Sequence, residues 1–262
     1  MLVTRVEKLS AVVPEGNGRF RVFTFDVEAS IEGDVDPASG MVVNLTTMKE
    51  EIRREVIGRL NGRALNGAEG APDAPTPESL AREIFGMLGG TVAGKRLARI
   101  RLVGAPGPIV EWRGGEEMDV TRVYDFSASH RLHAPGLSTE DNVRVFGKCN
   151  NAAGHGHNYG LEVTLRGRPR ATGELLPAAE FDRIVAREVV DRWDHRHLNE
   201  DVEEFRGVNP TAEEIARVAW RRLAAPLAAA AGEGRRLFRI KLRETERNHV
   251  EYYGEGAPGE TT

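Results

Sequence analysis

The sequence contains a single cysteine among its 262 residues, which excludes an intrachain disulfide. Long apolar runs are also missing: the longest alanine-rich stretch, residues 223–232, contains Pro226 and is too short to span a bilayer. Residues 1–8 lack the apolar core of a signal peptide. We therefore expect a soluble, cytoplasmic protein with no membrane partner.

An excess of positive charge is missing as well. The chain has 36 Lys and Arg residues against 40 Asp and Glu residues, a net charge of −4, and no tract dense in lysine or arginine. Proteins that bind nucleic acids usually present a basic patch or stripe, so we expect no nucleic-acid partner. The glycine-rich phosphate loops of the Walker and dinucleotide types are absent too.

Histidine is absent from residues 1–120, but three histidines and the only cysteine fall within 28 residues of the second half. His155 and His157 are two positions apart, so in a strand both side chains point to the same face and can hold one metal ion. His130 lies in an alternating segment, residues 124–132, which predicts another strand. Three histidines with a fourth position left open are typical of a catalytic zinc site.

Each of these features could also arise for plainer reasons. Two histidines at i and i+2 can be ordinary strand residues, and a lone cysteine such as Cys149 is usually a small buried apolar side chain. The neighbouring glycines could be simple turn residues. Their concentration in one short segment favours a metal site with a cysteine chosen for its chemistry.

This segment resembles the 6-pyruvoyltetrahydropterin synthase and 6-carboxytetrahydropterin synthase family. The resemblance is carried by FSASHRL at residues 126–132, FGKCNN at 146–151 and GHGHNY at 154–159. It covers roughly residues 120–255 and continues in family order through five more pairs: Thr172-Gly173, Asp194-His195, Leu198-Asn199, Pro210-Thr211 and Glu244-Thr245.

The two halves of the chain repeat each other at an offset of 133 to 140 residues. The apolar helical pattern of residues 181–193 recurs at 48–60, and the alternating segment 237–242 recurs at 97–102. This indicates a tandem duplication. Each copy predicts the order strand, strand, helix, helix, strand, strand, which is an α+β fold with a four-stranded antiparallel sheet and two helices on one face.

The first copy lacks the reactive residues of the second. Asn61 and Gly62 stand where the second copy has Asp194 and His195, and residues 104–105 are Gly-Ala where the second copy has Glu-Thr. We therefore expect a degenerate structural domain at residues 1–116 and a catalytic domain at 117–262. The resemblance implies the tunnelling fold, whose units join edge to edge, and a homo-oligomer that is a trimer or hexamer of two-unit chains.

The resemblance also implies the reaction and the roles of the site residues. Family members act on a pterin triphosphate, 7,8-dihydroneopterin triphosphate, and eliminate triphosphate without an external redox cofactor. Zn²⁺ would be held by His130, His155 and His157, and Mg²⁺ would accompany the substrate triphosphate. Five further residues would then bind or transform the substrate: the general base Cys149, the proton-handling pair Asp194 and His195, the pterin-binding Glu244, and Thr211.

Simpler structural roles stay open for several of these residues. Asp194 could cap a helix beside a surface histidine, Glu244 could be an exposed acid at a strand end, and Thr211 could equally be a helix cap. Three other histidines lack partners in the pattern and are expected at the surface or in packing: His133, His197 and His249. Four arginines are candidates to receive the triphosphate, and the sequence does not choose among them: Arg131, Arg166, Arg168 and Arg170.

Three functions follow from this pattern. The five residues between Cys149 and His155 are typical of the pyruvoyl-forming branch and favour a lyase that makes 6-pyruvoyltetrahydropterin. A composition rich in Ala, Arg and Gly keeps 6-carboxytetrahydropterin synthase, which releases acetaldehyde and triphosphate in the queuosine and deazapurine pathway, as an alternative. The second alternative is a non-catalytic pterin-binding scaffold, although binding alone does not require a thiol base.

Overall fold

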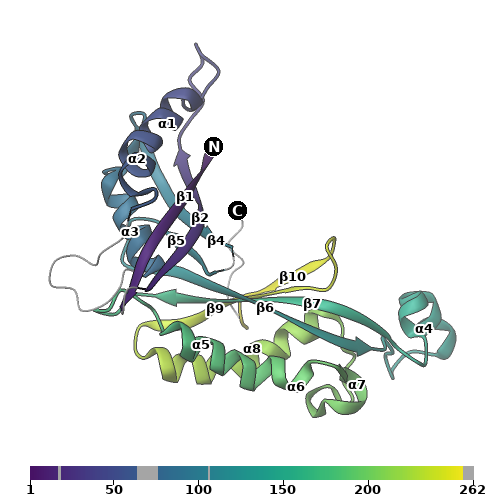
Figure 1. The fold of residues 1–262 in the computed structure, drawn as a ribbon. Coiled ribbons are helices and arrows are strands. Elements are labelled where there is room, and N and C mark those ends of the chain that lie inside the picture. Colours follow the sequence, from purple (N-terminus) through teal and green to yellow (C-terminus); the bar gives the residue numbers. More distant parts are fainter. Residues whose placement is uncertain (17–18, 64–75, 106, 256–262) are drawn as a thin grey trace. The chain divides into compact units, whose positions relative to one another are not determined.

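The computed structural model describes residues 1–16, 19–63, 76–105 and 107–255, which are drawn in colour in Figure 1. The chain divides into two compact units. The first comprises Met1–Thr121 and Arg166–Leu175, and the second comprises Arg122–Leu165 and Leu176–Thr262. The domain boundary predicted between residues 116 and 117 lies in the turn that joins two strands, β5 and β6.

The first unit is built on antiparallel strands in the order β1-β2-β4-β5. The short strand β3 pairs with the beginning of β4, and the first residues of β6 pair with β5. The bounds of these strands are β1 Leu2–Gly16, β2 Arg19–Glu32, β3 Thr91–Val92, β4 Lys95–Gly104, β5 Ile109–Trp112 and β6 Met118–His130.

Two helical segments accompany this sheet. The first runs through α1 (Leu45–Ile52), a π-helical turn (Arg53–Ile57) and α2 (Gly58–Leu60), and the second is α3 (Pro77–Met87). Asn44 and Thr76 cap their N-termini through side-chain oxygens that accept backbone N–H bonds. The side chains of the predicted apolar stripe recur on one face of the first helical segment, and all four are buried: Met48, Ile52, Val56 and Leu60.

The second unit repeats this plan with strands in the order β6-β7-β9-β10. Strand β7 comprises His155–Gly167, β9 comprises Arg235–Arg243 and β10 comprises His249–Tyr252. A two-residue strand, β8 (Arg196–His197), pairs in parallel with β6 and was not predicted. The α+β class and the arrangement of four main strands with helices on one face are confirmed, with β3 and β8 as additions.

The helices of the second unit lie along one side of its sheet, as Figure 1 shows for α5, α6 and α8. They begin with α5 (Ala178–Val185), a π-helical turn (Ala186–Val190) and α6 (Asp191–Trp193), and continue with α7 (Leu198–Asp201), a 3-10 turn (Glu203–Phe205) and α8 (Ala212–Ala231). The π-helical turns of the two units lie 133 residues apart, from Arg53 to Ala186, at the same place in the repeat. This shared irregularity supports the duplication.

Two helices were missed by the sequence analysis, the four-residue α7 and the longer α4. Between β6 and β7 the chain forms α4 (Thr139–Phe146) and a 3-10 turn (Gly147–Asn150). Val143 and Val145 are 56% and 57% exposed, so α4 has no continuous apolar face from which to predict it. None of the helices that the structure describes is long and apolar enough to cross a membrane.

Candidate active site

The three histidines form one group. His130 ends β6, and His155 and His157 begin β7, the strand beside it. Their ligand atoms all lie within 4.8 Å of one another, and the Nε2 atoms of His130 and His155 are 3.1 Å apart. The pairing of β6 with β7 therefore joins residues that are 25 positions apart, and the group can hold a metal ion.

The hydrogen bonding of His130 prepares its Nε2 atom for a metal. Its Nδ1 atom lies 2.8 Å from the carbonyl oxygen of Pro210, so Nδ1 carries the proton and the Nε2 lone pair faces His155. Burial lowers the pKa of His130 to about 4, against the opposing effect of the Pro210 carbonyl. Burial also lowers the pKa of His155. Neutral imidazole is the form that binds metals, so both rings suit a ligand role.

The donor set fits a metal in a second way. The Nε2 atom of His157 is buried and has no hydrogen-bond partner among the described residues. A buried polar atom without a partner is costly, and a metal ion would satisfy it. Imidazole nitrogens suit zinc, copper, iron and nickel. The geometry therefore supports a metal ion at these three rings but does not identify which metal it is.

Glu244 lies beside the histidine group, directly after β9. Its Oε1 atom is 3.7 Å from His130 Nε2 and 3.8 Å from His157 Nε2. Its backbone N–H donates to the carbonyl oxygen of Asn248, which closes the turn between β9 and β10. The residue expected to bind the pterin thus lies at a strand end, but it is only 20% exposed and sits beside the histidine group.

Cys149 lies in the 3-10 turn that follows α4, and its side chain is a partly exposed free thiol. Its carbonyl oxygen accepts a 2.9 Å hydrogen bond from the N–H of Leu132, two residues beyond His130. The side-chain amide of Asn150 donates to the carbonyl oxygen of Leu132 at 2.7 Å. These two bonds attach the cysteine turn to the end of β6.

Asp194 and His195 form a second pair, at the turn after α6. The His195 Nδ1 atom is 2.8 Å from Asp194 Oδ2, and Asp194 Oδ1 accepts from the N–H of Ser127 at 2.8 Å. The bonds from Ser127 and His195 lower the pKa of Asp194. His195 has φ of 57°, which is uncommon for a residue other than glycine, and its N–H donates to the Ser127 carbonyl oxygen. Such strain is often found at functional sites.

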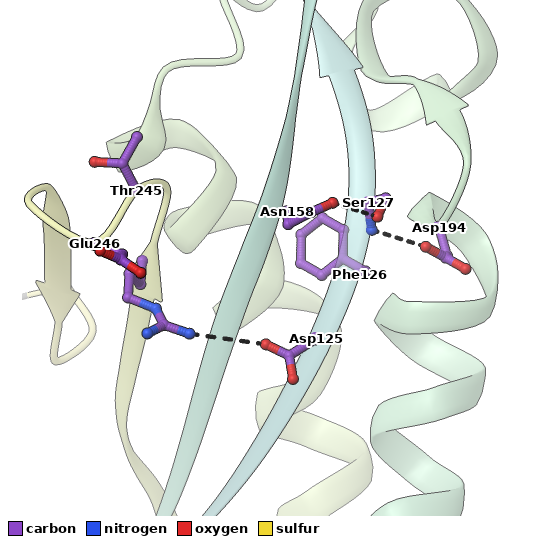
Figure 2. Close-up of a pocket in the computed structure, with 8 residues that line it drawn as sticks. Asp125, Phe126, Ser127, Asn158, Asp194, Thr245 and Glu246 are labelled. Carbon is purple, nitrogen blue, oxygen red and sulfur yellow. Dashed lines mark hydrogen bonds and ion pairs between the residues drawn. The ribbon is translucent and has the colours of Figure 1, made fainter.

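Two hollows adjoin these residues. Figure 2 shows the first, a cavity of about 660 Å³, in which Asp194 bonds to Ser127 and Ser127 faces Asn158. This volume lies within the range of small-molecule sites, about 300–1,000 Å³. The second hollow also has Ser127 and Asn158 in its wall and is lined by His157 and His195. His157 and His195 therefore border the same hollow, whereas the Nε2 atom of His157 is buried.

The remaining predicted residue, Thr211, is the N-cap of α8, where its hydroxyl accepts from the N–H of Glu214 at 3.4 Å. A substrate role for Thr211 stays a prediction. Sequence analysis did not anticipate the contributions of Pro210 and Ser127. Both act through main-chain atoms, which carry no side-chain signal in a sequence.

Together the fold and the histidine group define a two-unit α+β protein whose second unit has three histidines placed so that they can hold a metal ion. A sequence model of the family described as 6-pyruvoyl tetrahydropterin synthase matches residues 20–115 and, again, residues 119–255. The chain therefore belongs to the 6-pyruvoyl tetrahydropterin synthase family. Because both halves match, the duplication predicted from the internal repeat is confirmed.

Individual relatives align over half of the chain. The 6-pyruvoyl tetrahydrobiopterin synthase of Drosophila melanogaster is 40% identical over 136 residues, which cover 52% of this chain and 79% of the relative. The human protein of the same name is 39% identical over 140 residues, covering 53% and 93%. The solved structure of Caenorhabditis elegans 6-pyruvoyl tetrahydropterin synthase is 36% identical, with a TM-score of 0.48 and coverage of 53% and 96%.

Proposed function

We propose that the second unit is a zinc-dependent tetrahydropterin synthase. It would act as a lyase that converts 7,8-dihydroneopterin triphosphate to 6-pyruvoyltetrahydropterin and eliminates triphosphate. Mg²⁺ would bind to the triphosphate group of the substrate. The observation that carries this proposal is the histidine group itself. Its ligand atoms all lie within 4.8 Å of one another, Glu244 lies beside them, and His157 and His195 line the same hollow.

Zinc suits this donor set, because catalytic zinc sites commonly have three protein ligands and one open position. His130, His155 and His157 would be the ligands, and the Pro210 carbonyl would orient the first of them. When bound, the ion would polarise a substrate hydroxyl as a Lewis acid.

Proton transfer would fall to Cys149 and to the Asp194-His195 pair. The thiolate of Cys149 is the proposed general base. In the pair, the Asp194 carboxylate accepts from His195 Nδ1, which leaves Nε2 as the atom that exchanges a proton with the substrate. The same carboxylate stabilises the imidazolium that forms when His195 takes up a proton. His195 is 81% exposed in the single chain, so its Nε2 atom is accessible.

Glu244 would recognise the pterin ring. A carboxylate can accept two parallel hydrogen bonds, here from the 2-amino group and the adjacent ring N–H. Thr211 would contribute a further contact close to Pro210. The hydrogen bond from the Glu244 N–H to the Asn248 carbonyl holds the backbone of this residue in place.

We propose that residues 1–116 form a structural copy and that residues 117–262 form the catalytic domain. The first 120 residues contain no histidine, so the first unit cannot build the same metal site. A chain with two units would form a homo-oligomer, as a trimer or hexamer. Its zinc content would then be one ion per chain rather than two.

The test is turnover of 7,8-dihydroneopterin triphosphate by the zinc-loaded protein with magnesium, with products identified by mass spectrometry. Cys149→Ala is the inactive comparison, and Val143→Ala, at an exposed position of α4, is the matched control. A 6-pyruvoyl product supports the proposal, whereas 6-carboxytetrahydropterin with acetaldehyde identifies the alternative synthase. Tight pterin binding and a full zinc load without turnover would identify a binding scaffold.

A further inference from the structure

A separate cavity lies where the chain leaves β6, immediately after His130. The residues that line it include Arg131, His133 and His197, together with Phe205, Gly207 and Val208. Sequence analysis named Arg131 as one of four candidates to receive the triphosphate and assigned the two histidines to the surface or to packing. Their surroundings in the structure indicate a role for all three.

The segment that carries Arg131 and His133 is held by side-chain amides instead of a neighbouring strand. Asn199 accepts from the N–H of Arg131 at 2.8 Å and donates to its carbonyl oxygen at 3.0 Å. The other amides bond the next three residues: Asn150 to Leu132, Asn209 to His133 and Asn142 to Ala134. Backbone groups require such partners. Four asparagines thus fix the backbone from which the two basic side chains extend.

The side chain of Arg131 is oriented by a hydrogen bond, but its positive charge is not paired with a carboxylate of the described residues. Its Nε atom donates to the Asn150 carbonyl oxygen at 3.1 Å, and no carboxylate pairs with it in the part of the chain that the structure describes. Arg122, in contrast, makes two bonds to Asp182. The two Nη groups of Arg131 are therefore available to an external anion, and the planar guanidinium fork matches phosphate oxygens.

The two histidines complete the cavity. Asn150 donates to His133 Nδ1 at 3.1 Å, so in the neutral ring Nε2 carries the hydrogen and is a donor. The Nδ1 atom of His197 is buried without a partner among the described residues. His197 also lines the hollow that is bordered by His157 and His195, so it is part of the wall of both.

We propose that this cavity is the subsite for the triphosphate chain of the substrate, with Arg131 and His133 donating to phosphate oxygens and His197 forming the wall towards the metal group. This inference rests on the proposed function, because it places the leaving group of that reaction. Glu200 is the acidic residue among those that line the cavity, and it is exposed at the protein surface. A polyanion in this cavity would thus meet the guanidinium of Arg131 and the N–H donor of His133.

The experiment uses the full-length, zinc-loaded protein and inorganic triphosphate as the probe. Its dissociation constant is measured by calorimetry for the wild type, Arg131→Gln and His133→Gln. The control is Arg221→Gln, which changes an exposed arginine on α8. A charge-assisted hydrogen bond corresponds to a change of about 10- to 100-fold in affinity, and we expect a loss of this size for Arg131→Gln. His133→Gln should lose less, and Arg221→Gln should match the wild type.

Two further measurements separate this role from a structural one. Zinc content and the affinity for 7,8-dihydroneopterin, which has no phosphate, should stay within about twofold of wild type in Arg131→Gln, since only the phosphate contact is lost. KM for the triphosphate substrate should rise more than kcat falls. Arg131→Lys should recover part of the affinity, because it restores the charge without the fork.

The outcomes distinguish this inference from the proposed function. Unchanged triphosphate affinity in both cavity variants, or no triphosphate binding by the wild type, overturns the subsite even if the enzyme turns over its substrate. Equal losses of dihydroneopterin and triphosphate affinity also overturn it, since they indicate a general distortion. Triphosphate binding that depends on Arg131, without any turnover by the wild type, supports the subsite and refutes the synthase.

Discussion

Gly154 directly precedes His155, and its missing side chain allows the backbone of His130 and the ring of His197 to lie close to it. It adopts φ of +70°, and a Cβ atom at this position would lie 2.7 Å from His197 Nε2 and 3.0 Å from the His130 carbonyl oxygen. Gly154→Ala is therefore expected to destabilise the second unit and to displace His130. Gly156→Ala is the matched control, because its nearest neighbour would be 3.7 Å away and its φ is not positive.

Two effects set the magnitude for Gly154→Ala. A left-handed backbone costs an L-residue roughly 1–2 kcal/mol. The clash with the His130 backbone resembles overpacking, which costs about 1–3 kcal/mol, whereas the His197 ring can rotate away. We expect the free energy of unfolding to fall by about 2–4 kcal/mol. Gly156→Ala should change it by less than about 0.5 kcal/mol.

The assay is urea unfolding followed by tryptophan fluorescence, since Trp193 is fully buried in the core of the second unit. Metal affinity is measured in parallel by competition with a chromophoric chelator. We expect weaker metal binding in Gly154→Ala, because its added methyl group presses on the strand that ends in His130. Equal unfolding free energies for the two alanine variants would refute the reasoning from backbone conformation and close contact.

Three other perturbations test separate parts of the molecule. His157→Ala should weaken zinc binding by at least about 100-fold in the chelator assay, because it removes one of three ligands. Asp194→Asn should lower kcat by about 10²–10⁴, measured at full zinc load, since it disturbs the His195 tautomer. Glu7→Gln should lower the unfolding free energy of the first unit by about 1–2 kcal/mol at pH 7 in urea titrations, because the 7% exposed carboxylate bonds to Arg5 and Arg53.

The pH dependence of the Glu7 effect follows from its pKa. Burial acts to raise this pKa, but the hydrogen bonds from Arg53 and Arg5 outweigh it and lower the pKa below 4.5. The carboxylate therefore contributes its full stability above about pH 4.5, and this is lost as the pH falls through the lower pKa of the folded state. Glu7→Gln and wild type should converge in that acidic range. A difference in unfolding free energy between the two proteins that stays constant down to about pH 3 would contradict this linkage. Unaltered zinc affinity in His157→Ala, or unaltered kcat in Asp194→Asn, would contradict those predictions.

The candidate site illustrates how much could be inferred before the structure. The i, i+2 spacing of His155 and His157 sufficed to place both rings on one face of a strand, because side chains alternate with a period of two. For Asp194 a helix-capping role was left open, and the Asp194-His195 pair lies at the turn after α6. Whether Cys149 and Thr211 act on a substrate stays a prediction, because spacing reports position and not reactivity.

Some elements of the fold and some residue positions could not be predicted from the sequence. The helix α4 was missed since its valines are exposed, and β8 was missed because a two-residue strand has no periodicity. His133 and His197 were assigned to the surface or to packing. Their place in a cavity beside Arg131 became visible only when residues 131–133 and 197–208 came together.

The sequence by itself determined the duplication, the α+β class and the identity of the three histidines, because these depend on local periods and on motifs that repeat along one chain. The tertiary structure decided which main-chain atoms orient the site. The Pro210 carbonyl is 80 positions from His130, and the Ser127 N–H is 67 positions from Asp194. Contacts across such separations depend on how β6, β7 and α8 pack, and no local spacing encodes that packing.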